Sequence, residues 1–259
     1  MVNQLLMSWD EYNKKKINLL IPYIFSIRNS EQSMVFFGAD HSYDKRNLQF
    51  NQLREEWEKF LKETGGNNCL VLVESRRTKL ANSEDEGIKE SGESGFITFL
   101  ANQKNIIVES PEPPHQYLFQ EWTKQFSREY IYYLLVARRI QWHSVLDDEN
   151  KKDLNYYFSK ELIKKDQEET GWFDFDFSLE HIKVIHKNLF DTNFDENNEK
   201  FFCQISRPDK EISIINEVAR AKSLIRNIYM VEQIERYWNE KKTYLLSMGL
   251  DMLLFKNQH

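Results

Sequence analysis

The stretch Cys69-Leu70-Val71-Leu72-Val73 decides the fold; it is an unbroken apolar run that ends at Glu74. Apolar and polar residues do not alternate in it, which is typical of a strand buried on both faces of a parallel sheet. A second apolar run, Met34-Val35-Phe36-Phe37, is followed by Gly38-Ala39-Asp40-His41. The two runs predict two strands, each with a polar side chain just beyond its carboxyl end.

Between these strands, apolar residues recur at helical spacing until Gly65-Gly66 ends the pattern. They are Phe50, Leu53, Trp57, Phe60 and Leu61. After Glu74, the polar residues 75–93 predict a long exposed loop, with a frayed helical turn in it as the alternative. A short helix is predicted from about 94 to 103. A third strand over 105–108 ends at Glu109, because the prolines at 111, 113 and 114 allow neither strand nor helix to continue.

The second half of the chain is mainly helical in pattern. A buried aromatic helix is predicted from about 116 to 143, and a helical insertion over 144–212 that covers one edge of the core. A long amphipathic helix follows over 214–238, and then a last strand over 243–248 that stops at Gly249. Within the insertion, the alternating segment Trp172–Phe177 is interpreted as a half-buried strand or loop, with an exposed protein-binding contact as the alternative.

This order of strands and helices predicts an α/β fold with a mainly parallel central sheet flanked by helices and joined by right-handed crossovers. No run of Gly, Ser or Pro resembles a linker between independent domains. We therefore expect residues 1–259 to form a single α/β domain, with 144–212 as a helical insertion or cap within it.

The composition excludes several classes of protein. Apolar residues make up 41% and charged residues 29% of the 259 residues, so the chain is not intrinsically disordered. The net charge of −6 disfavours a nucleic-acid partner. No apolar stretch approaches the roughly 20 residues that span a bilayer, and the first residues do not resemble a secretory signal. With Cys69 and Cys203 expected as reduced thiols, the sequence predicts a cytoplasmic protein.

The predicted site lies where the strands end. In α/β sheets the ligand crevice lies beyond the carboxyl ends of the strands, and here those ends carry His41, Glu74, Glu109 and Asp251. Imidazole and carboxylate groups together suit a divalent ion such as Mn, Co, Fe or Zn. The alternative is structural: His41 fixes the turn after its strand, and the carboxylates face solvent or pair with cations at the end of the sheet.

Five short motifs carry a resemblance to a known family. They are Gly38-Ala39-Asp40-His41, Val71-Leu72-Val73-Glu74, Gly92-Glu93-Ser94-Gly95-Phe96, Glu109-Ser110-Pro111-Glu112-Pro113 and Arg226-Asn227-Ile228-Tyr229-Met230. In order and placement they resemble the TraB/Tiki group, which is related to erythromycin esterase-like and ChaN-like proteins. The resemblance implies an α/β core and a metal-dependent hydrolase that cleaves peptide or ester bonds in a small-molecule or peptide substrate.

The chain departs from this family at the end of its last predicted strand. The family's final strand normally ends in Gly-x-x-His, whereas this chain reads Gly249-Leu250-Asp251-Met252. A thioether is a poor ligand for Mn or Zn, so Asp251 is the candidate that supplies an oxygen instead. The alternative is a catalytically weakened relative, a pseudoenzyme that binds a ligand or a protein through the same crevice.

Two further residues are candidates for catalysis. Glu93 is a candidate general acid or base that reaches into the crevice, although a carboxylate near the start of a helix is also stabilising by itself. Arg226 lies beside the apolar stripe of its helix. It is expected to clamp a substrate carboxylate or to orient Glu74 or Glu109, unless it is simply an exposed arginine.

Overall fold

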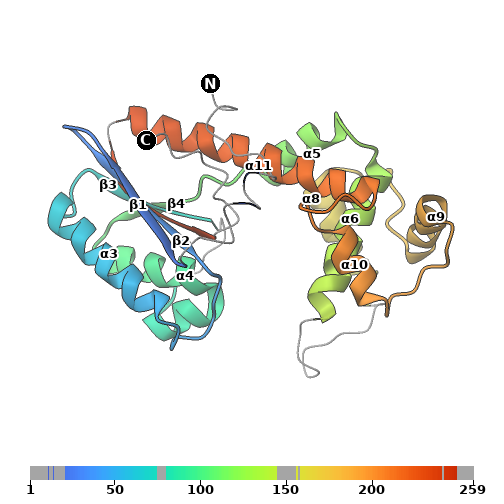
Figure 1. The fold of residues 1–259 in the computed structure, drawn as a ribbon, viewed down its shortest axis with the longest axis horizontal. Helices are drawn as coiled ribbons and strands as arrows, with labels where there is room; N and C mark the ends of the chain where they lie inside the picture. The colour runs from blue at the N-terminus through green and yellow to red at the C-terminus, as the bar shows by residue number, and fades with distance from the viewer. Residues whose placement is uncertain are drawn as a thin grey trace. The chain divides into compact units, whose positions relative to one another are not determined.

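The computed structural model contains one five-stranded sheet and helices on both sides of it (Figure 1). It describes residues 11, 14, 21–74, 80–144, 156, 158–240 and 242–249. The strands are β1 (Tyr23–Arg28), β2 (Ser33–Ala39), β3 (Cys69–Val73), β4 (Ile107–Glu109) and β5 (Thr243–Gly249). The described helices are α3 (Gln49–Thr64), α4 (Glu84–Gln103), α5 (His115–Thr123), α6 (Arg128–Ser144), α8 (Lys160–Thr170), α9 (Leu179–Phe190), α10 (Glu199–Ile205) and α11 (Ile214–Asn239).

The chain divides into two compact units. The first comprises residues 1–112 and 227–259, and the second comprises residues 113–226. The division falls within the proline-rich stretch after β4 and again within α11, so this one helix contributes to both units. The predicted insertion at 144–212 falls inside the second unit. That the two units together make a single domain stays a prediction.

The sheet of the first unit has the strand order β1-β2-β5-β3-β4. The last strand in the chain, β5, lies in the middle and is parallel to both β2 and β3. The edge strand β1 is antiparallel to β2 and was not predicted, because a single half-exposed run of six residues has little hydrophobic pattern. The expectation of an α/β fold with a mainly parallel sheet is confirmed.

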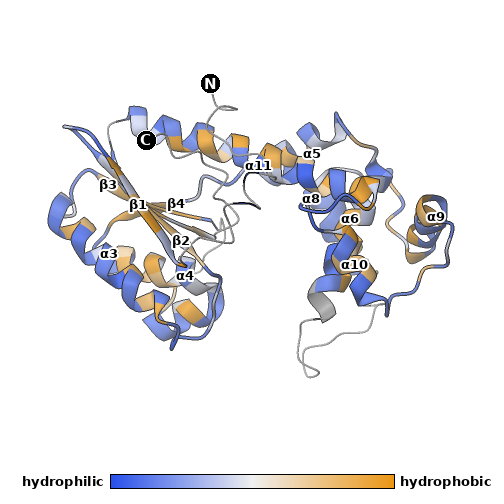
Figure 2. Cartoon of the chain, viewed as in Figure 1, coloured by the Kyte–Doolittle hydropathy of each residue, from blue (hydrophilic) through white to orange (hydrophobic). Residues whose placement is uncertain are grey.

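Helices cover both faces of this sheet, as its apolar strands require (Figures 1 and 2). Alternate strand residues such as Phe36, Leu72 and Leu246 pack with the carboxyl half of α11. The residues between them, such as Val71 and Leu245, pack with α3 and α4. The two apolar clusters hold the strand ends in fixed register, and this register positions the site described below.

Two predictions of secondary structure were wrong. Residues 84–93, predicted as part of an exposed loop, form the first half of α4. Its polar and acidic sequence gave no apolar stripe, but Ser83 caps the helix by accepting a hydrogen bond from the Glu86 amide, and acidic residues occupy its first turn. The helix predicted over 116–143 is two helices, α5 and α6, separated at 124–127.

The second unit is helical and has its own core. Trp122, Tyr132, Tyr133 and Phe202 are among its fully buried side chains, and the Trp122 indole donates to the backbone carbonyl of Val218. Trp172–Phe177 is a loop, in which Trp172 and Phe177 are buried and Phe173 is exposed. The described helices over 144–212 agree with a helical insertion, although residues 145–155 and 157 lie outside the described part of the chain.

Among the residues that the structure describes, no helix is long and apolar enough to cross a membrane. The free cysteines Cys69 and Cys203 are both partly buried. Burial raises the pKa of the Cys69 thiol, so this group is a poor nucleophile at neutral pH.

Candidate functional site

Three strand ends meet at the carboxyl edge of the sheet. Ala39 of β2 pairs with Gly249 of β5, and Val73 of β3 pairs with Ser247 of the same strand. His41 follows β2 by two residues and Glu74 follows β3 directly, so both side chains lie over the end of β5. The His41 Nε2 atom is 3.6 Å from the Glu74 Oε2 atom.

Gly249 lets the two side chains approach each other. A Cβ atom at this position would lie 2.4 Å from His41 Nε2 and 3.0 Å from Glu74 Oε2, closer than side chains pack. The Gly249 amide also donates a hydrogen bond to Glu74 Oε2 at 2.6 Å. The end of β5 therefore supplies both the space for the imidazole and a donor that fixes the carboxylate.

Glu93 holds the other side of the imidazole. Its carboxylate is 2% exposed, and its Oε1 atom lies 2.5 Å from His41 Nδ1. Glu93 thus occupies the Nδ1 side of the ring, and Nε2 is the ring nitrogen that faces Glu74. The sequence predicted Glu93 as an acid or base that reaches into the crevice. Its contact with Nδ1 adds a second role, in which Glu93 orients His41.

A kink in α4 puts Glu93 in this place. Ser91 and Gly92 have non-helical backbone angles, and Gly92 has a φ of +56°, so Glu93 starts a new helical segment. The backbones before and after the kink touch, since a Cβ at Gly95 would lie 2.0 Å from the Gly87 carbonyl oxygen.

Glu109 has a different partner. It pairs in register with Leu72, two residues before Glu74, and its carboxylate accepts a hydrogen bond from the Tyr237 hydroxyl of α11. Burial, followed by the neighbouring Glu109 carboxylate, raises the pKa of Tyr237 to about 12, so this hydroxyl stays protonated and donates. Among the described contacts, Glu109 is therefore part of a link between β4 and α11.

The remaining predicted residues are Asp251 and Arg226. Asp251 and Met252 are outside the described residues. Arg226 is partly buried on α11 and belongs to the second unit. His41, Glu74 and Glu93 are thus the three predicted residues whose mutual contacts the structure defines.

His41 and Glu74 present an imidazole nitrogen and a carboxylate oxygen, two kinds of atom that bind divalent cations in proteins. Two ligand atoms bound about 2.1 Å from a tetrahedral ion are about 3.4 Å apart, close to the observed 3.6 Å between Nε2 and Oε2. In metal-binding histidines the second ring nitrogen usually contacts a carboxylate, and Nδ1 of His41 contacts Glu93. Within the described ranges, however, no three His, Cys, Asp or Glu side chains form a complete set of metal ligands.

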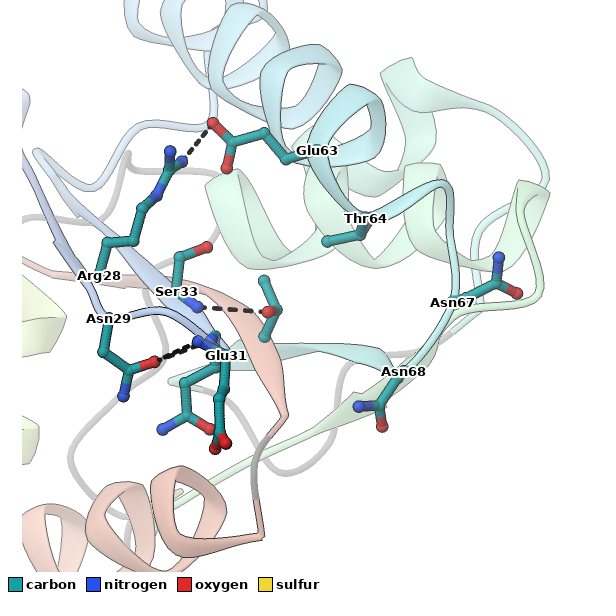
Figure 3. Close-up of a pocket in the computed structure, with 10 residues that line it drawn as sticks. Arg28, Asn29, Glu31, Ser33, Glu63, Thr64, Asn67 and Asn68 are labelled. Atoms are coloured by element: carbon teal, nitrogen blue, oxygen red, sulfur yellow. Dashed lines mark hydrogen bonds and ion pairs between the residues drawn. The ribbon is translucent and has the colours of Figure 1, made fainter.

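A separate hollow of about 390 Å³ lies at the opposite, amino ends of the strands (Figure 3). Its polar lining comes from the turn between β1 and β2, the end of α3 and the starts of β3 and β5. Arg28 in its wall forms an ion pair with Glu63 at 2.5 Å, and the Ser33 amide donates to Thr243 Oγ1 (Figure 3). Arg28, Glu63, Ser33 and Thr243 thus pair within the wall, and we assign no chemistry to this hollow.

Sequence reasoning missed Gly249 and Tyr237 as contributors to the site. Gly249 was interpreted as the residue that stops the last strand, although a glycine between a histidine and a carboxylate in neighbouring strands also signals close approach. Tyr237 gave no signal, because its partner depends on the register of β4. No protein-family model, curated protein or solved structure matches this chain. The resemblance to the TraB/Tiki group stays a prediction.

Proposed function

We propose that the chain is a metal-dependent hydrolase, related to the TraB/Tiki and erythromycin esterase-like proteins, that cleaves ester or peptide bonds at the carboxyl edge of its sheet. One observation carries the proposal: Glu93 contacts Nδ1 of His41, and Nε2 of the same ring faces the Glu74 carboxylate 3.6 Å away. With a neutral imidazole, two carboxylates give this cluster a net negative charge that favours a cation. A cytoplasmic location accompanies the proposal.

In this proposal, His41 and Glu74 hold the ion, and Asp251 is the candidate for a third protein ligand. A divalent ion such as Mn, Co, Fe or Zn supplies an activated water molecule or polarises the substrate carbonyl. Glu93 holds the imidazole at Nδ1, and the Gly249 amide keeps Glu74 turned toward His41. The exposed His41 ring, with 58% of its side chain accessible, leaves the site open to a substrate.

Metal binding is the direct test. Purified protein should contain close to one divalent ion per chain, and the metal-free protein should take up Mn²⁺ or Zn²⁺ in calorimetric titration. We expect His41→Ala and Glu74→Gln to abolish binding, and Glu93→Gln to weaken it roughly 10- to 100-fold because it orients the ligand without touching the ion. His115→Ala, which removes an exposed histidine on α5, is the matched control and should bind as the wild type does.

A wild-type protein that takes up no metal would rule the proposal out. Hydrolysis of ester and peptide substrates by the metal-loaded protein tests the reaction itself.

A weakened relative that only binds a ligand or protein is the second candidate, favoured by the engagement of Glu109 with Tyr237 and by Met252 in place of the family histidine. It predicts that the wild type is inactive and that Met252→His restores hydrolysis, whereas an active wild type contradicts it.

A further inference from the structure

The two edge strands of the sheet differ in how they are protected against pairing with another chain. The strand order β1-β2-β5-β3-β4 leaves one side of β1 and one side of β4 without a neighbouring strand in the described part of the chain. Backbone N–H and C=O groups on such a side can pair with an incoming strand. β4 is protected, because it has only three residues, ends at Glu109 and is followed by the prolines at 111, 113 and 114.

The strand β1 lacks these protections. Its six residues pair with β2 in one unbroken register, from Tyr23 opposite Gly38 to Arg28 opposite Ser33, so no bulge interrupts it. Arg28 is the one charged residue of β1, and its guanidinium forms an ion pair with Glu63 of α3 at 2.5 Å. The five residues before Arg28 include neither a charged residue nor a proline, the two devices that usually prevent edge pairing.

Apolar side chains are exposed along β1 on both faces of the sheet. Ile24 is 37% exposed and Ile27 is 48% exposed, and they lie on opposite faces because side chains alternate along a strand. Tyr23 and Phe25 share the face of Ile27 and are partly buried against the apolar cluster that includes the carboxyl half of α11. The Phe25 ring stacks on the ring of Phe36 in β2 with 4.9 Å between the centroids, so an aromatic ring is already fixed next to this edge.

We propose that β1 is a dimerisation surface, where it pairs with β1 of a second copy of this chain so that one sheet continues across both copies. In the antiparallel arrangement with Phe25 opposite its counterpart in the second copy, Tyr23 lies opposite Ile27, and Ile24 lies opposite Ser26. Pairs of two aromatic residues, or of an aromatic and a β-branched residue, are favourable between neighbouring strands. The arrangement has two-fold symmetry, so it closes as a dimer.

The charge of β1 favours this arrangement and a second copy as the partner. Antiparallel pairing separates the two Arg28 side chains by about 20 Å along the strand direction, well beyond the screening length of about 8 Å at physiological salt. Parallel pairing would place them side by side. Since burying an unpaired charge against Ile24 or Ile27 costs free energy, this edge requires an uncharged apolar partner strand, and β1 itself is one. The inference does not depend on metal binding or hydrolysis.

The mass of the full-length protein in solution, measured by size-exclusion chromatography with light scattering, tests the dimer. One strand from each copy makes a small interface, so we expect the wild type to have the mass of two chains at high concentration and to dissociate on dilution in the micromolar range. Ile27→Lys should raise the dissociation constant at least tenfold, because the two-fold symmetry introduces the charge twice.

Two further variants support this comparison. Ile24→Lys places the charge on the other face of the sheet and should weaken the dimer in the same way. Because both isoleucines are exposed in a single chain, each variant should have a Tm close to that of the diluted wild type. Val184→Lys replaces an apolar residue of α9 that is 56% exposed, and as the matched control it should form the dimer as the wild type does.

Hydrogen exchange followed by mass spectrometry locates the interface. In the wild type, peptides that cover 23–28 should exchange more slowly at high than at low protein concentration, because the outer N–H groups of β1 become hydrogen-bonded in the dimer. Ile27→Lys should remove this dependence on concentration. Peptides that cover β4 should show no dependence in either protein.

Three results would overturn the inference. A wild type that is monomeric at every concentration would mean that β1 does not pair with itself and would leave its edge to a strand of another protein. A dimer that is as stable in both lysine variants of β1 as in the wild type, or one that leaves exchange at 23–28 unchanged, would mean that the copies meet at a different surface.

Discussion

At the residue scale, a single methyl group at Gly249 tests the geometry of the proposed metal site. The added Cβ would lie 2.4 Å from Nε2 and 2.8 Å from Cε1 of His41. Because 58% of the His41 side chain is exposed, the ring has room to swing away, and we expect Gly249→Ala to change the Tm little. Metal affinity, measured by calorimetric titration, should fall as far as in His41→Ala, because Nε2 no longer faces Glu74.

Gly66→Ala is the matched control, and it should lower the stability while leaving the metal affinity unchanged. Gly66 has a φ of +75° and open space around its Cβ position, so Gly66→Ala should lower the unfolding free energy by about 1 kcal/mol through backbone strain and leave metal binding intact. The NMR signals of the His41 ring give a readout without metal. Unchanged ring signals and unchanged affinity in Gly249→Ala would show that the site does not depend on this close approach.

The sequence predicted part of this site at the level of single residues. His41 and Glu74 converge because the carboxyl ends of parallel strands meet at one edge of a sheet, which the apolar runs alone indicate. Glu109 pairs with Leu72 and bonds to Tyr237 because of the register between β3 and β4, which hydrophobic pattern does not determine. The contact between Glu93 and His41 depends on a positive φ at Gly92, which the sequence permits but does not specify.

At the scale of elements, the kinked helix α4 depends on two glycines in contact. A Cβ at Gly95 would lie 2.0 Å from the carbonyl oxygen of Gly87, a backbone atom that cannot move aside by a change of rotamer. We therefore expect Gly95→Ala to lower the unfolding free energy in urea by at least about 2 kcal/mol. The same substitution should weaken metal binding, because it displaces the segment that begins at Glu93.

Gln103→Ala is the control for this helix. Gln103 is the exposed last residue of α4, and its replacement should leave both the urea midpoint and the metal affinity unchanged. A Gly95→Ala protein as stable as the wild type would mean that α4 is straight or that the two glycines do not touch.

The elements that the sequence predicted best are those with a clear apolar period. The helix ending at Gly65 and the long helix over 214–239 were located within a few residues, because each buries one continuous stripe. The first half of α4 was missed for the opposite reason. Its polar residues 84–86 and 89–90 carry no stripe, and its helical state comes from the Ser83 cap and from Gly87 packing on Gly95.

At the scale of the whole molecule, the second unit carries a buried histidine that makes its stability depend on pH. His186 is 3% exposed, its Nδ1 and Nε2 atoms contact the Tyr133 hydroxyl and Thr192 Oγ1, and aromatic rings surround it. Burial lowers the pKa of His186 below its ordinary value of 6.5. As pH falls through 6.5, His186 becomes protonated in the unfolded chain but stays neutral in the folded unit. Acid therefore favours the unfolded state.

The contribution of His186 is fully present above pH 6.5 and is lost as pH decreases toward its lowered folded pKa. Hydrogen exchange followed by mass spectrometry at pH values on both sides of 6.5, corrected for the intrinsic exchange rate, measures it locally. We expect peptides from α9 and α10 to lose protection at the lower pH. His186→Phe keeps a ring in the aromatic cage and removes the titrating group, so much of this pH dependence should disappear.

His115→Gln removes an exposed histidine from the same unit and should retain the acid sensitivity of the wild type. If the His186→Phe protein kept the full acid sensitivity of the wild type, the effect would come from other groups.

His186 belongs to residues 113–226, whereas the proposed metal site belongs to the first unit. The acid destabilisation of the second unit and the loss of metal binding in acid are therefore separable. Protons compete with metal for His41 whatever residue occupies position 186, so metal affinity at low pH should be equal in the wild type and in His186→Phe.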